Sequence, residues 1–375
     1  MRHYSLKKAV RDADGQSVSS VHQTKYYQTS RIETSDGHAL TLFRSPSPLG
    51  ERRGGRPVVL LPGLGSNRLT FGIASGQTLA CALNAVGRDV WVVEFRGNAS
   101  SNRLGVVAGP VDLASKLEID LPRALEQIHE ATGYSQVDLV GHSVGGLFAT
   151  LYAAQNHASV GRIVTVCAPL DFSEVLGKSA ILARLPARAL ARLSRRLARL
   201  PIIDLAKIGG PIPHLIALRA HFGRSSSDRH LRRRYLDEAV EDLAGTEVAQ
   251  ILSWVGGANL PPISPRQALA GLQTPTLVMG ARDDRVVPVA QVKACFEAIG
   301  APDKRLEMVS RRDGGLHNYG HAGILIAADA KHDVYPSIVA WLSGATTSAT
   351  SAPDARSDAS GLALSGKRTV SLQAR

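Results

Sequence analysis

The chain contains no long apolar run. No stretch of its 375 residues approaches the about 18 apolar positions that a membrane-spanning helix needs, and residues 1–20 are polar and mixed in charge, unlike a secretory signal. Cysteine is scarce as well: Cys81, Cys167 and Cys295 are widely spaced and odd in number. This pattern argues against a disulfide framework and a zinc cluster. Because each cysteine lies in an apolar segment, we expect buried free thiols and a cytoplasmic location.

Acidic residues are too few to balance the basic ones. The sequence has 44 Lys and Arg against 32 Asp and Glu, which leaves a formal net charge of +12. Such a charge attracts polyanions and anionic membrane surfaces, and it also keeps a protein soluble. No basic strand interleaved with aromatic residues and no zinc-finger spacing is found, so nucleic acid is not an expected partner.

Residues 181–200 concentrate this positive charge. Leucines and arginines recur there at helical spacing, so that leucines form one stripe and arginines line another face. Pro186 is expected to start or kink this helix. A basic amphipathic helix can lie peripherally on an anionic lipid surface. It can equally place its leucines on the protein core and its arginines in water, and the sequence leaves both interpretations open.

Short apolar segments alternate with helical patterns along most of the chain. A hairpin is expected within 32–43, around Asp36-Gly37. Apolar runs of strand length lie at 57–61, 89–95, 137–142, 162–167, 276–279 and 305–309. Helical spacing of apolar residues is found at 78–86, 113–132, 147–154, 289–299 and 333–342. This alternation predicts an α/β fold, with a mostly parallel central sheet and helices on both faces.

The alternation breaks between residues 171 and 270, where Leu, Ala and Arg dominate and the pattern is mostly helical. We interpret 171–270 as a helical cap inserted into a core formed by 29–170 and 271–343. Residues 1–28 show no periodicity and are expected to form a loose arm. Residues 344–375 are rich in Ser, Thr, Ala, Asp and Arg, a composition that predicts a disordered tail.

The strongest local signal is the Gly-His-Ser-Val-Gly sequence at 141–145, with an apolar strand before it and a helical run after it. A sharp strand-to-helix turn holds a serine out for attack, and its strained backbone requires small neighbours. Gly141 and Gly145 meet that requirement, and Gly146 lets the helix pack closely. We therefore predict that Ser143 is a nucleophile.

A serine nucleophile also needs donors for the negative charge that develops on the substrate oxygen. The strand at 57–61 runs into Pro-Gly-Leu-Gly. Enzymes with a nucleophile turn of this kind take one backbone N–H from such a loop and another from the residue after the nucleophile. The expected oxyanion donors are therefore the N–H groups of Leu64 and Val144.

The acid that orients the catalytic base is expected just after a late strand. Two adjacent carboxylates compete for that position: counting from Gly280 selects Asp283, whereas counting back from Pro288 selects Asp284. Both remain candidates, and the one that is not used would be a solvated loop charge or would pair with a neighbouring arginine. Asp171, after the preceding strand, is a more distant third choice.

The base is expected in a loop before the last helix. His321 lies in Asn-Tyr-Gly-His-Ala-Gly, where small neighbours free the imidazole to approach the serine. His317 is a loop residue without an expected catalytic role, and His332, beside the last helix, is expected at the surface. The side chain of His142 is expected to point into the wall of the site. We therefore predict that His321 is the base.

With these residues the chain resembles the α/β-hydrolase superfamily and, within it, the acid-lipase-like branch. The likeness is carried by the turn at 141–145, the strand and loop at 58–65, the Asp-Val-Trp strand with Arg-Gly-Asn at 89–103, and the Tyr-Gly-His loop with the final helix at 319–341. The chain departs from the branch at Pro62, where histidine is usual, and in the insertion, which shows no usable likeness. The resemblance implies a carboxylic-ester hydrolase with a lid.

We therefore predict a serine esterase or lipase that forms an acyl-enzyme on Ser143 and cleaves a small-molecule or lipid ester without a metal or an organic cofactor. Two alternatives stay open. The same residues serve an acyltransferase, and a non-catalytic ligand-binding protein can share the fold. A polyester polymerase would normally carry cysteine at the nucleophile position, and epoxide or haloalkane chemistry would need aspartate there.

Overall fold

The computed structural model describes residues 28–47, 55–72, 78–101, 110–170, 199–200, 221–223, 229–255 and 264–344. Its strands are β1 (Gln28–Glu33), β2 (Ala39–Ser45), β3 (Val58–Leu61), β4 (Val90–Glu94), β5 (Val137–His142), β6 (Val160–Val166), β7 (Arg199–Leu200), β8 (Leu243–Ala244), β9 (Thr276–Ala281) and β10 (Lys304–Val309). Its helices are α2 (Leu79–Ala85), α3 (Leu113–Ser115), α4 (Leu121–Thr132), α5 (Val144–Gln155), α9 (Arg229–Arg234), α10 (Gly245–Val255), α11 (Pro265–Gly271), α12 (Val289–Ala298), α13 (Gly323–Ile326), α14 (Ala330–Asp333) and α15 (Tyr335–Leu342).

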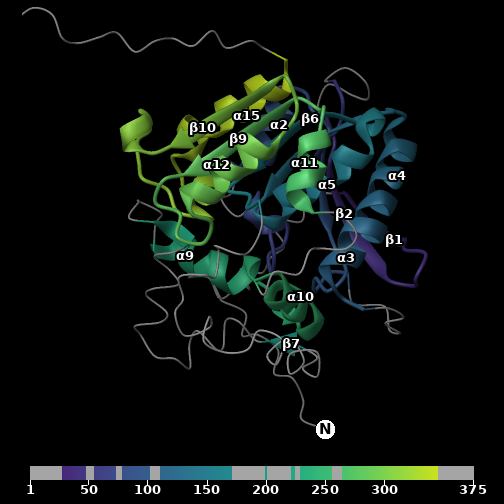
Figure 1. The fold of residues 1–375 in the computed structure, drawn as a ribbon. Coiled ribbons are helices and arrows are strands. Elements are labelled where there is room, and N and C mark those ends of the chain that lie inside the picture. The colour runs from purple at the N-terminus through teal and green to yellow at the C-terminus, as the bar shows by residue number, and fades with distance from the viewer. Residues whose placement is uncertain are drawn as a thin grey trace, which may run out of the picture.

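The core is an eight-stranded sheet in the order β1-β2-β4-β3-β5-β6-β9-β10 (Figure 1). The first two strands form the expected hairpin, and β2 pairs antiparallel with β4. The remaining neighbours are all parallel. The predicted mostly parallel sheet is therefore confirmed, with its antiparallel pairs at one edge.

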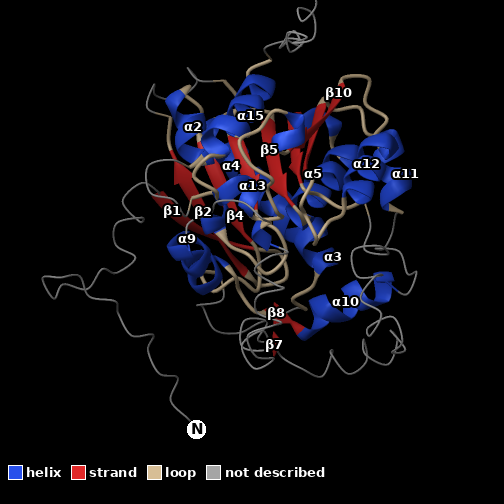
Figure 2. Ribbon diagram, turned by 90° about the vertical axis from the view of Figure 1, so that its left-hand side faces the viewer, coloured by secondary structure: helices blue, strands red, loops and turns tan. Residues whose placement is uncertain are grey.

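Both faces of the sheet are covered by helices, as Figure 2 shows. Successive side chains of a strand point to opposite faces. Accordingly, Val58 and Leu60 pack in a cluster with α2 and α15, whereas Val59 and Leu61 pack in a second cluster with α4 and α5. The fully apolar strands in the sequence thus reflect burial on both sides.

Parallel strands place their carboxyl ends at the same edge of the sheet, and the loops that follow them meet there. The loop after β4 is fastened by Arg96, whose side chain is fully buried. Its guanidinium nitrogens contact Asp120 at 2.7 Å and Asp36, in the hairpin turn, at 2.6 Å. Burial of a charge is tolerated only when it is paired in this way. The Arg-Gly-Asn segment therefore ties the loop to the hairpin and to the segment before α4.

The segment predicted as one helix over 113–132 is interrupted. Residues Lys116–Asp120 form a π-helical turn between α3 and α4. A π-helical turn inserts extra backbone into a helix and redirects the side chains around it, and such turns are frequent at functional sites. Here the turn begins with Lys116 and ends with Asp120, the partner of the buried arginine.

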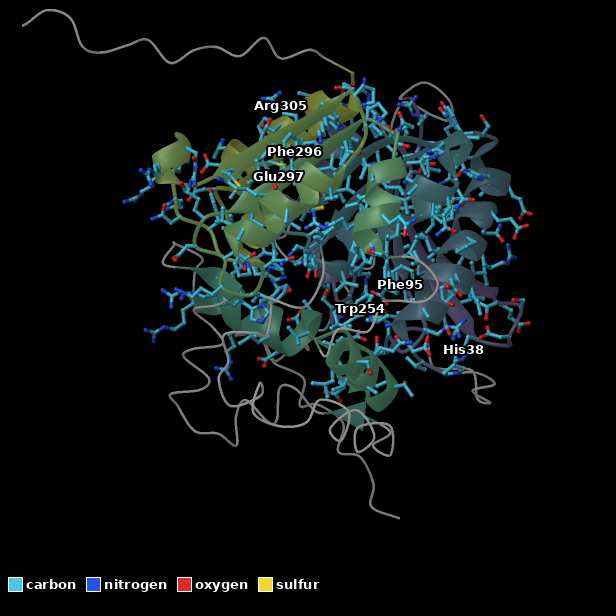
Figure 3. All side chains as sticks on the ribbon, in the orientation of Figure 1. His38, Phe95, Trp254, Phe296, Glu297 and Arg305 are labelled. Atoms are coloured by element: carbon cyan, nitrogen blue, oxygen red, sulfur yellow. The ribbon has the colours of Figure 1, made fainter. Side chains whose placement is uncertain are left out.

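The described part of the insertion lies against the loop that follows β3. The N–H of Asn67 donates to the carbonyl of Ala239 at 3.0 Å, and the N–H of Glu241 donates to the carbonyl of Gly65 at 2.8 Å. Figures 1 and 2 both place α9 and α10 at one end of the sheet. Trp254 of α10 belongs to the same apolar cluster as Phe95 of the core, and Figure 3 labels both residues. The insertion therefore shares both hydrogen bonds and apolar packing with the core.

Two expectations are wrong. Cys81 is exposed, because Leu79, Ala80 and Leu83 form the buried side of α2 and leave Cys81 on its outer side. The helix expected over 181–200 does not reach its predicted end, because β7 pairs antiparallel with β8 and so fixes the last two residues as a strand.

Several expectations fall outside the described residues. The rest of that helix, 181–198, is one of them, and the loose arm up to residue 27 and the tail from residue 345 are the others. Among the helices that the structure describes, none has the length and apolar character needed to cross a membrane.

Candidate active site

Ser143 lies in a strained turn between β5 and α5. Its φ of 54° is positive, a conformation that residues other than glycine rarely adopt. A methyl group added at Gly145 would collide with the carbonyl oxygen of Leu61, and one at Gly141 would collide with the backbone of Gly145. Glycine is therefore required on both sides of the serine, and the G-x-S-x-G pattern reflects backbone contact between the turn and β3.

A buried histidine and a buried carboxylate meet on the loops after β9 and β10. The Nδ1 atom of His321 lies 2.7 Å from Oδ2 of Asp284, and both residues are buried. The other oxygen of Asp284 accepts from the N–H groups of Val286 and Val287 at 2.8 and 2.9 Å. Burial alone would raise the pKa of Asp284, but the His321 ring and these two donors outweigh burial and hold the pKa below its ordinary value. The carboxylate is thus ionised and held in place beside the imidazole.

Of the two adjacent carboxylates, the structure places Asp284 beside the His321 ring. Asp284 contacts His321, whereas Asp283 is half-buried and is not the partner of that ring. Adjacent residues of a turn point in different directions, so only one of them can face the imidazole. The backbone donors of Val286 and Val287 reach Asp284 because it caps the turn in front of them.

His142 connects the serine turn to the histidine loop. Its Nε2 lies 2.9 Å from the carbonyl oxygen of His321, and the two ring centroids are 4.7 Å apart. Burial lowers the pKa of His142 to about 3, and the nearby His321 ring adds to the effect. The ring is therefore neutral, and its Nε2–H donates to that carbonyl. The residue predicted to line the wall of the site also holds the backbone of the predicted base.

The loop after β3 closes on the same turn. A Cβ atom at Gly63 would lie 3.0 Å from the Cβ of Ser143 and 3.2 Å from Nδ1 of His142. The N–H of Val144, at the start of α5, belongs to the helix end that has no intrahelical acceptor. Neither this N–H nor that of Leu64 has a hydrogen-bond acceptor among the described residues. Both donors are therefore free to donate to an oxygen atom of a ligand.

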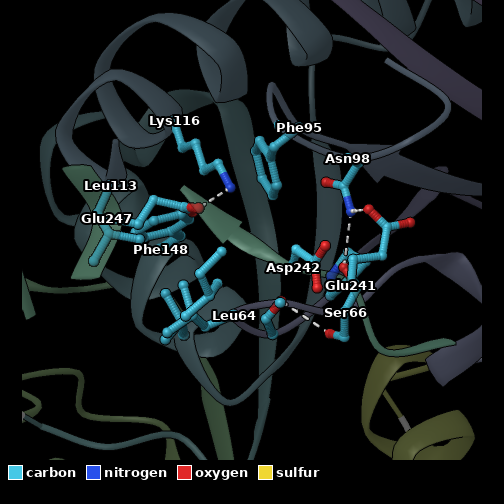
Figure 4. Close-up of a pocket in the computed structure, with 16 residues that line it drawn as sticks. Leu64, Ser66, Phe95, Asn98, Leu113, Lys116, Phe148, Glu241, Asp242 and Glu247 are labelled. Atoms are coloured by element: carbon cyan, nitrogen blue, oxygen red, sulfur yellow. Dashed lines mark hydrogen bonds and ion pairs between the residues drawn. The ribbon is translucent and has the colours of Figure 1, made fainter. Parts of the chain in front are cut away.

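Leu64 and Val144 also line a small, partly open pocket (Figure 4). The loops after β3 and β4 form part of its wall, and residues 241–247 of the insertion complete it. The pocket therefore adjoins the two backbone donors and lies between the core loops and the insertion.

Comparison with known families agrees with this geometry. A family model described as the alpha/beta hydrolase fold matches residues 56–318, which is more than half of the chain. The chain belongs to the α/β-hydrolase fold family.

Curated relatives of this α/β hydrolase include a lipase and a polymerase subunit. It is 31% identical to the gastric triacylglycerol lipase of Rattus norvegicus over 150 residues, which are 37% of this chain and 38% of the lipase. It is 25% identical to a poly(3-hydroxyalkanoate) polymerase subunit of Allochromatium vinosum over 134 residues, 36% of each chain. The chain thus matches little more than a third of the length of these curated relatives. The resemblance to lipases is confirmed at the level of this shared segment.

Among solved structures, an esterase from Exiguobacterium antarcticum superposes with a TM-score of 0.58 at 19% sequence identity. The match covers 84% of this chain and the whole of the esterase. At this low identity the likeness establishes the shared fold only, and the chemistry must be argued from the residues themselves.

The other histidines considered from the sequence lie apart from the acid–base pair of this α/β hydrolase. Nε2 of His317 contacts Asp329 at 2.6 Å, and His332 is exposed on α14. Asp171 lies outside the described residues. The structure therefore brings His321, Asp284 and the serine turn to one edge of the sheet, and it leaves the alternative histidines elsewhere.

A further histidine of the α/β hydrolase was not expected at the site. His221, from the insertion, faces His321 edge-on with ring centroids 6.0 Å apart, and its carbonyl accepts from the N–H of Ala322 at 2.7 Å. Burial lowers the pKa of His221 to about 4, so its ring is neutral. The sequence around it, Arg-Ala-His-Phe-Gly, carries no recognisable motif. Only the folded chain could reveal this position.

One group of side chains in the described residues has the composition of a metal site. The ligand atoms of Cys167, Asp284 and His321 all lie within 4.8 Å of one another. Burial and the neighbouring Asp284 carboxylate, however, raise the pKa of the Cys167 thiol well above its ordinary value. Metals bind the thiolate, and here the thiol form is strongly favoured. Asp284 and His321 are moreover hydrogen-bonded to each other, so this set favours proton chemistry over metal ligation.

Proposed function

We propose that this α/β hydrolase is a serine hydrolase that cleaves carboxylic esters through an acyl-enzyme on Ser143. The observation that carries the proposal is the buried hydrogen bond between His321 and Asp284, beside a serine whose backbone is strained. A weak nucleophile becomes reactive when a base is within reach and a third group fixes the tautomer of that base.

The first half-reaction forms the acyl-enzyme. Oγ of Ser143 attacks the ester carbonyl carbon, and Nε2 of His321 takes the serine proton. Asp284 accepts from Nδ1–H of the same ring, which keeps Nε2 unprotonated before the attack and stabilises the imidazolium after it. The N–H groups of Leu64 and Val144 would hold the oxyanion, and each such donor is typically worth a factor of about 10² to 10³ in rate.

The second half-reaction releases the acid. His321 gave its proton to the alcohol when the ester C–O bond broke and the acyl-enzyme formed. It now takes a proton from water, whose oxygen attacks the acyl carbonyl carbon. The serine leaves and recovers its proton from the imidazolium. All steps use proton transfer and backbone donors of this chain, which is the chemistry that the buried residues of the site support.

Labelling tests the nucleophile directly. The folded protein should react with a fluorophosphonate probe, and peptide mapping should locate the label on Ser143. The Ser143→Ala variant should fold normally, resist the probe and lose hydrolysis of p-nitrophenyl esters. Retained turnover in this variant would overturn the assignment, and an unlabelled but folded wild-type protein would favour a non-catalytic binding protein.

An acyltransferase is the second candidate function. The sequence segment that this chain shares with a polymerase subunit supports this candidate. The two functions differ in whether water or another alcohol attacks the acyl-enzyme. Hydrolysis of a short p-nitrophenyl ester in the presence of added alcohols separates them by product analysis. A hydrolase yields mainly free acid, whereas a transferase yields the new ester as the main product.

We also propose that the insertion covers the site as a cap. Its contacts with the loops after β3 and before α13 support this placement, because both loops carry proposed site residues. Contact of residues 181–200 with lipid stays a prediction from the sequence. Co-sedimentation with neutral and anionic vesicles tests it: equal binding to both would remove the electrostatic basis of the idea.

A further inference from the structure

The loop that carries Leu64 is a tight turn closed by Ser66. The N–H of Ser66 donates to the carbonyl of Gly63 at 3.3 Å, and the Ser66 hydroxyl donates to the same carbonyl at 2.9 Å. A peptide unit is planar, so the N–H of Leu64 lies in one plane with the carbonyl of Gly63 and points the opposite way. Whatever holds the Gly63 carbonyl therefore also sets the direction of the Leu64 N–H, one of the two proposed oxyanion donors.

Ser66 is in turn held by the insertion. It forms an isolated antiparallel bridge with Val240, and backbone hydrogen bonds on either side of the bridge join the loop to residues 239–241. Gly65 permits this close approach. Its φ of 58° is left-handed, and a Cβ atom there would lie 3.1 Å from the carbonyl oxygen of Glu241. The insertion thus adds a short extended segment to the edge of the loop after β3.

The carboxylate of Glu241 joins this segment to two loops of the core at once. Oε1 accepts from the side-chain amide of Asn67 at 3.0 Å, and Oε2 accepts from the amide of Asn98 at 3.0 Å and from the N–H of Ala99 at 2.8 Å. The amide nitrogen of Asn98 also donates to the carbonyl of Ser66 at 3.1 Å, and Figure 4 shows both residues beside Glu241. Hydrogen bonds to a carboxylate are stronger than those between neutral groups. Glu241 therefore ties the loops after β3 and β4 to each other as well as to the insertion.

The two buried amide side chains are oriented so that only an acceptor fits between them. Oδ1 of Asn67 accepts from the N–H of Leu69 at 3.0 Å, and its Nδ2 also donates to the carbonyl of Glu238 at 2.8 Å. Turning the Asn67 amide round would lose both bonds, and turning the Asn98 amide would set its oxygen against a carbonyl. Glutamine at position 241 would offer one oxygen and one NH₂ group, and the NH₂ would face a donor. The position therefore favours a carboxylate over other polar side chains.

The insertion has other attachments to the core that do not involve this loop. Nζ of Lys116 contacts Glu247 at 2.6 Å, and the N–H of Leu113 donates to the side chain of Gln250 at 2.6 Å. Both core residues lie in the segment before α4. Replacing Glu241 should therefore loosen the loop after β3 without detaching the insertion.

We infer that Glu241 is a positioning residue, which holds the Leu64 N–H in the direction that the oxyanion of the reaction requires. The inference rests on the proposed ester hydrolysis and adds a residue of the insertion to that site. A donor that is in place before charge develops on the substrate oxygen needs no reorganisation during the reaction. The insertion thereby helps to form the oxyanion site.

Steady-state kinetics on p-nitrophenyl butyrate tests the effect on rate. Glu241→Ala should lower kcat about 10- to 100-fold, less than the about 10² to 10³ expected for outright loss of one donor, and Glu241→Gln should lower it about 3- to 10-fold. KM should change by less than about three-fold in both, because the interaction is made mainly in the transition state. Asp242→Asn is the matched neighbour and should keep the wild-type kcat. An unchanged kcat in Glu241→Ala would overturn the inference.

Inhibitor binding separates positioning of the donor from general damage to the site. With a trifluoromethyl ketone, Oγ of Ser143 bonds to the ketone carbon, the serine proton passes to His321, and the ketone oxygen becomes an oxyanion against the two donors. The corresponding amide binds without developing charge. In Glu241→Ala the Ki of the ketone should rise by about the factor by which kcat falls, whereas the Ki of the amide should change by less than about three-fold. An equal rise for both ligands contradicts the inference.

Thr132→Val is the control for stability. Its hydroxyl donates to the carbonyl of Ile128 at 2.6 Å at the end of α4, before β5 begins, whereas Ser143 follows the other end of β5. Loss of this buried bond should lower the urea midpoint about as much as Glu241→Gln does, with kcat and the ketone Ki unchanged. If Thr132→Val lowered kcat as much as Glu241→Gln, the rate loss would follow from stability alone and the inference would fail.

Hydrogen exchange of the loop distinguishes this inference from the proposed function, because it needs no substrate. Mass spectrometry follows the amides of a peptide spanning residues 63–69. Exchange should be about ten-fold faster in Glu241→Ala than in the wild-type protein or in Thr132→Val. If this result is found while the wild-type protein hydrolyses no ester, Glu241 still positions the Leu64 N–H and only the proposed function fails. Unchanged exchange overturns the inference even if ester hydrolysis is confirmed.

Discussion

The core and the insertion supply different parts of the site, and they are held in different ways. Ser143, Asp284 and His321 follow core strands, and buried hydrogen bonds or a strained turn fix each of them. The insertion contributes His221 and the carboxylates of residues 241–247. It contacts the core through backbone hydrogen bonds, the packing of α10, the Lys116–Glu247 ion pair and side-chain hydrogen bonds of Glu241. The residues proposed to carry out the chemistry thus follow strands of the core, and the insertion places further side chains next to them.

Catalytic geometry and substrate choice place different demands on these two regions. Catalytic geometry tolerates only small displacements, and a parallel sheet supplies that rigidity at its strand ends. Substrate choice tolerates variation, and an inserted segment can change without disturbing the acid–base pair. If the comparison holds, variants in the core should lose rate or global stability, and variants in the insertion should lose less of both.

The largest effect is expected at the acid. Asp284→Asn should lower kcat by about 10⁴, because an amide beside Nδ1 no longer holds the productive tautomer or stabilises the imidazolium. Asp283→Asn should change kcat by less than about three-fold, since the carboxylate bonded to Nδ1 of His321 is that of Asp284. Steady-state kinetics on one p-nitrophenyl ester compares the two. A larger loss at Asp283 would place the acid there, against the geometry.

The next largest effect concerns buried charge. Arg96→Met leaves Asp120 without its partner inside the core and should lower the free energy of unfolding by about 3–5 kcal/mol. Glu247→Met breaks the pair that joins the core to the insertion and should cost less, because Lys116 is slightly exposed and can recruit water. Urea unfolding of both variants gives the comparison. Equal losses would show that the insertion unfolds as one cooperative unit with the core.

A pH series distinguishes the two regions through their histidines. The pKa values of His142 and His221 are lowered by burial from an ordinary 6.5 to about 3 and about 4. As pH falls below about 6.5, the unfolded chain binds protons that the folded chain does not, so stability is complete above that pH and decreases below it. The slope should be about 1.4 kcal/mol per pH unit for each histidine, down to about pH 4.

Urea unfolding between pH 7 and pH 4.5 measures this slope. His142→Gln should reduce it by the share of one histidine, and the exposed His332→Gln should leave it unchanged. The same slope is measured for His221→Gln, which lies in the insertion, to compare the insertion with the core. A reduction equal to that of His142→Gln means that the insertion unfolds with the core, whereas no reduction means that it opens beforehand.

The smallest effect is expected where the insertion meets the loops of the core. Glu241 accepts from the side-chain amides of Asn67 and Asn98 at 3.0 Å and from the N–H of Ala99 at 2.8 Å. Glu241→Gln keeps an acceptor but loses the charge, so the free energy of unfolding should fall by about 1 kcal/mol. Asp242→Asn is the matched neighbour and should change it by less than about half of that. A loss of several kcal/mol would mean that this contact is part of the core.

Much of the core was predictable from local pattern. Apolar runs bounded by turn residues predicted the strands because burial on both faces leaves no polar position in a parallel strand. The serine turn was predictable since its backbone admits only glycine at Gly141 and Gly145. The expectation that His321 is paired with a carboxylate from the loop after a late strand followed from the order of these residues along the chain. Each of these features is set by constraints within a few residues.

Other features depended on contacts between distant segments. Whether Asp283 or Asp284 faces the imidazole depends on how one turn is oriented, and neighbouring carboxylates look alike in sequence. The exposure of Cys81 depends on which side of α2 meets the sheet. The π-helical turn at Lys116 is favoured by its partners, Glu247 in the insertion and Asp120 beside Arg96, rather than by local propensity.

The amino-acid sequence by itself determined the α/β class, the strained serine turn and the identity of the predicted base, because spacing and glycine placement act locally. Only the tertiary structure decided that Asp284 contacts that base, that His142 donates to its carbonyl, and that His221 lies beside its ring. The physical reason is that directional hydrogen bonds and buried ion pairs depend on atoms brought together from far apart in the chain.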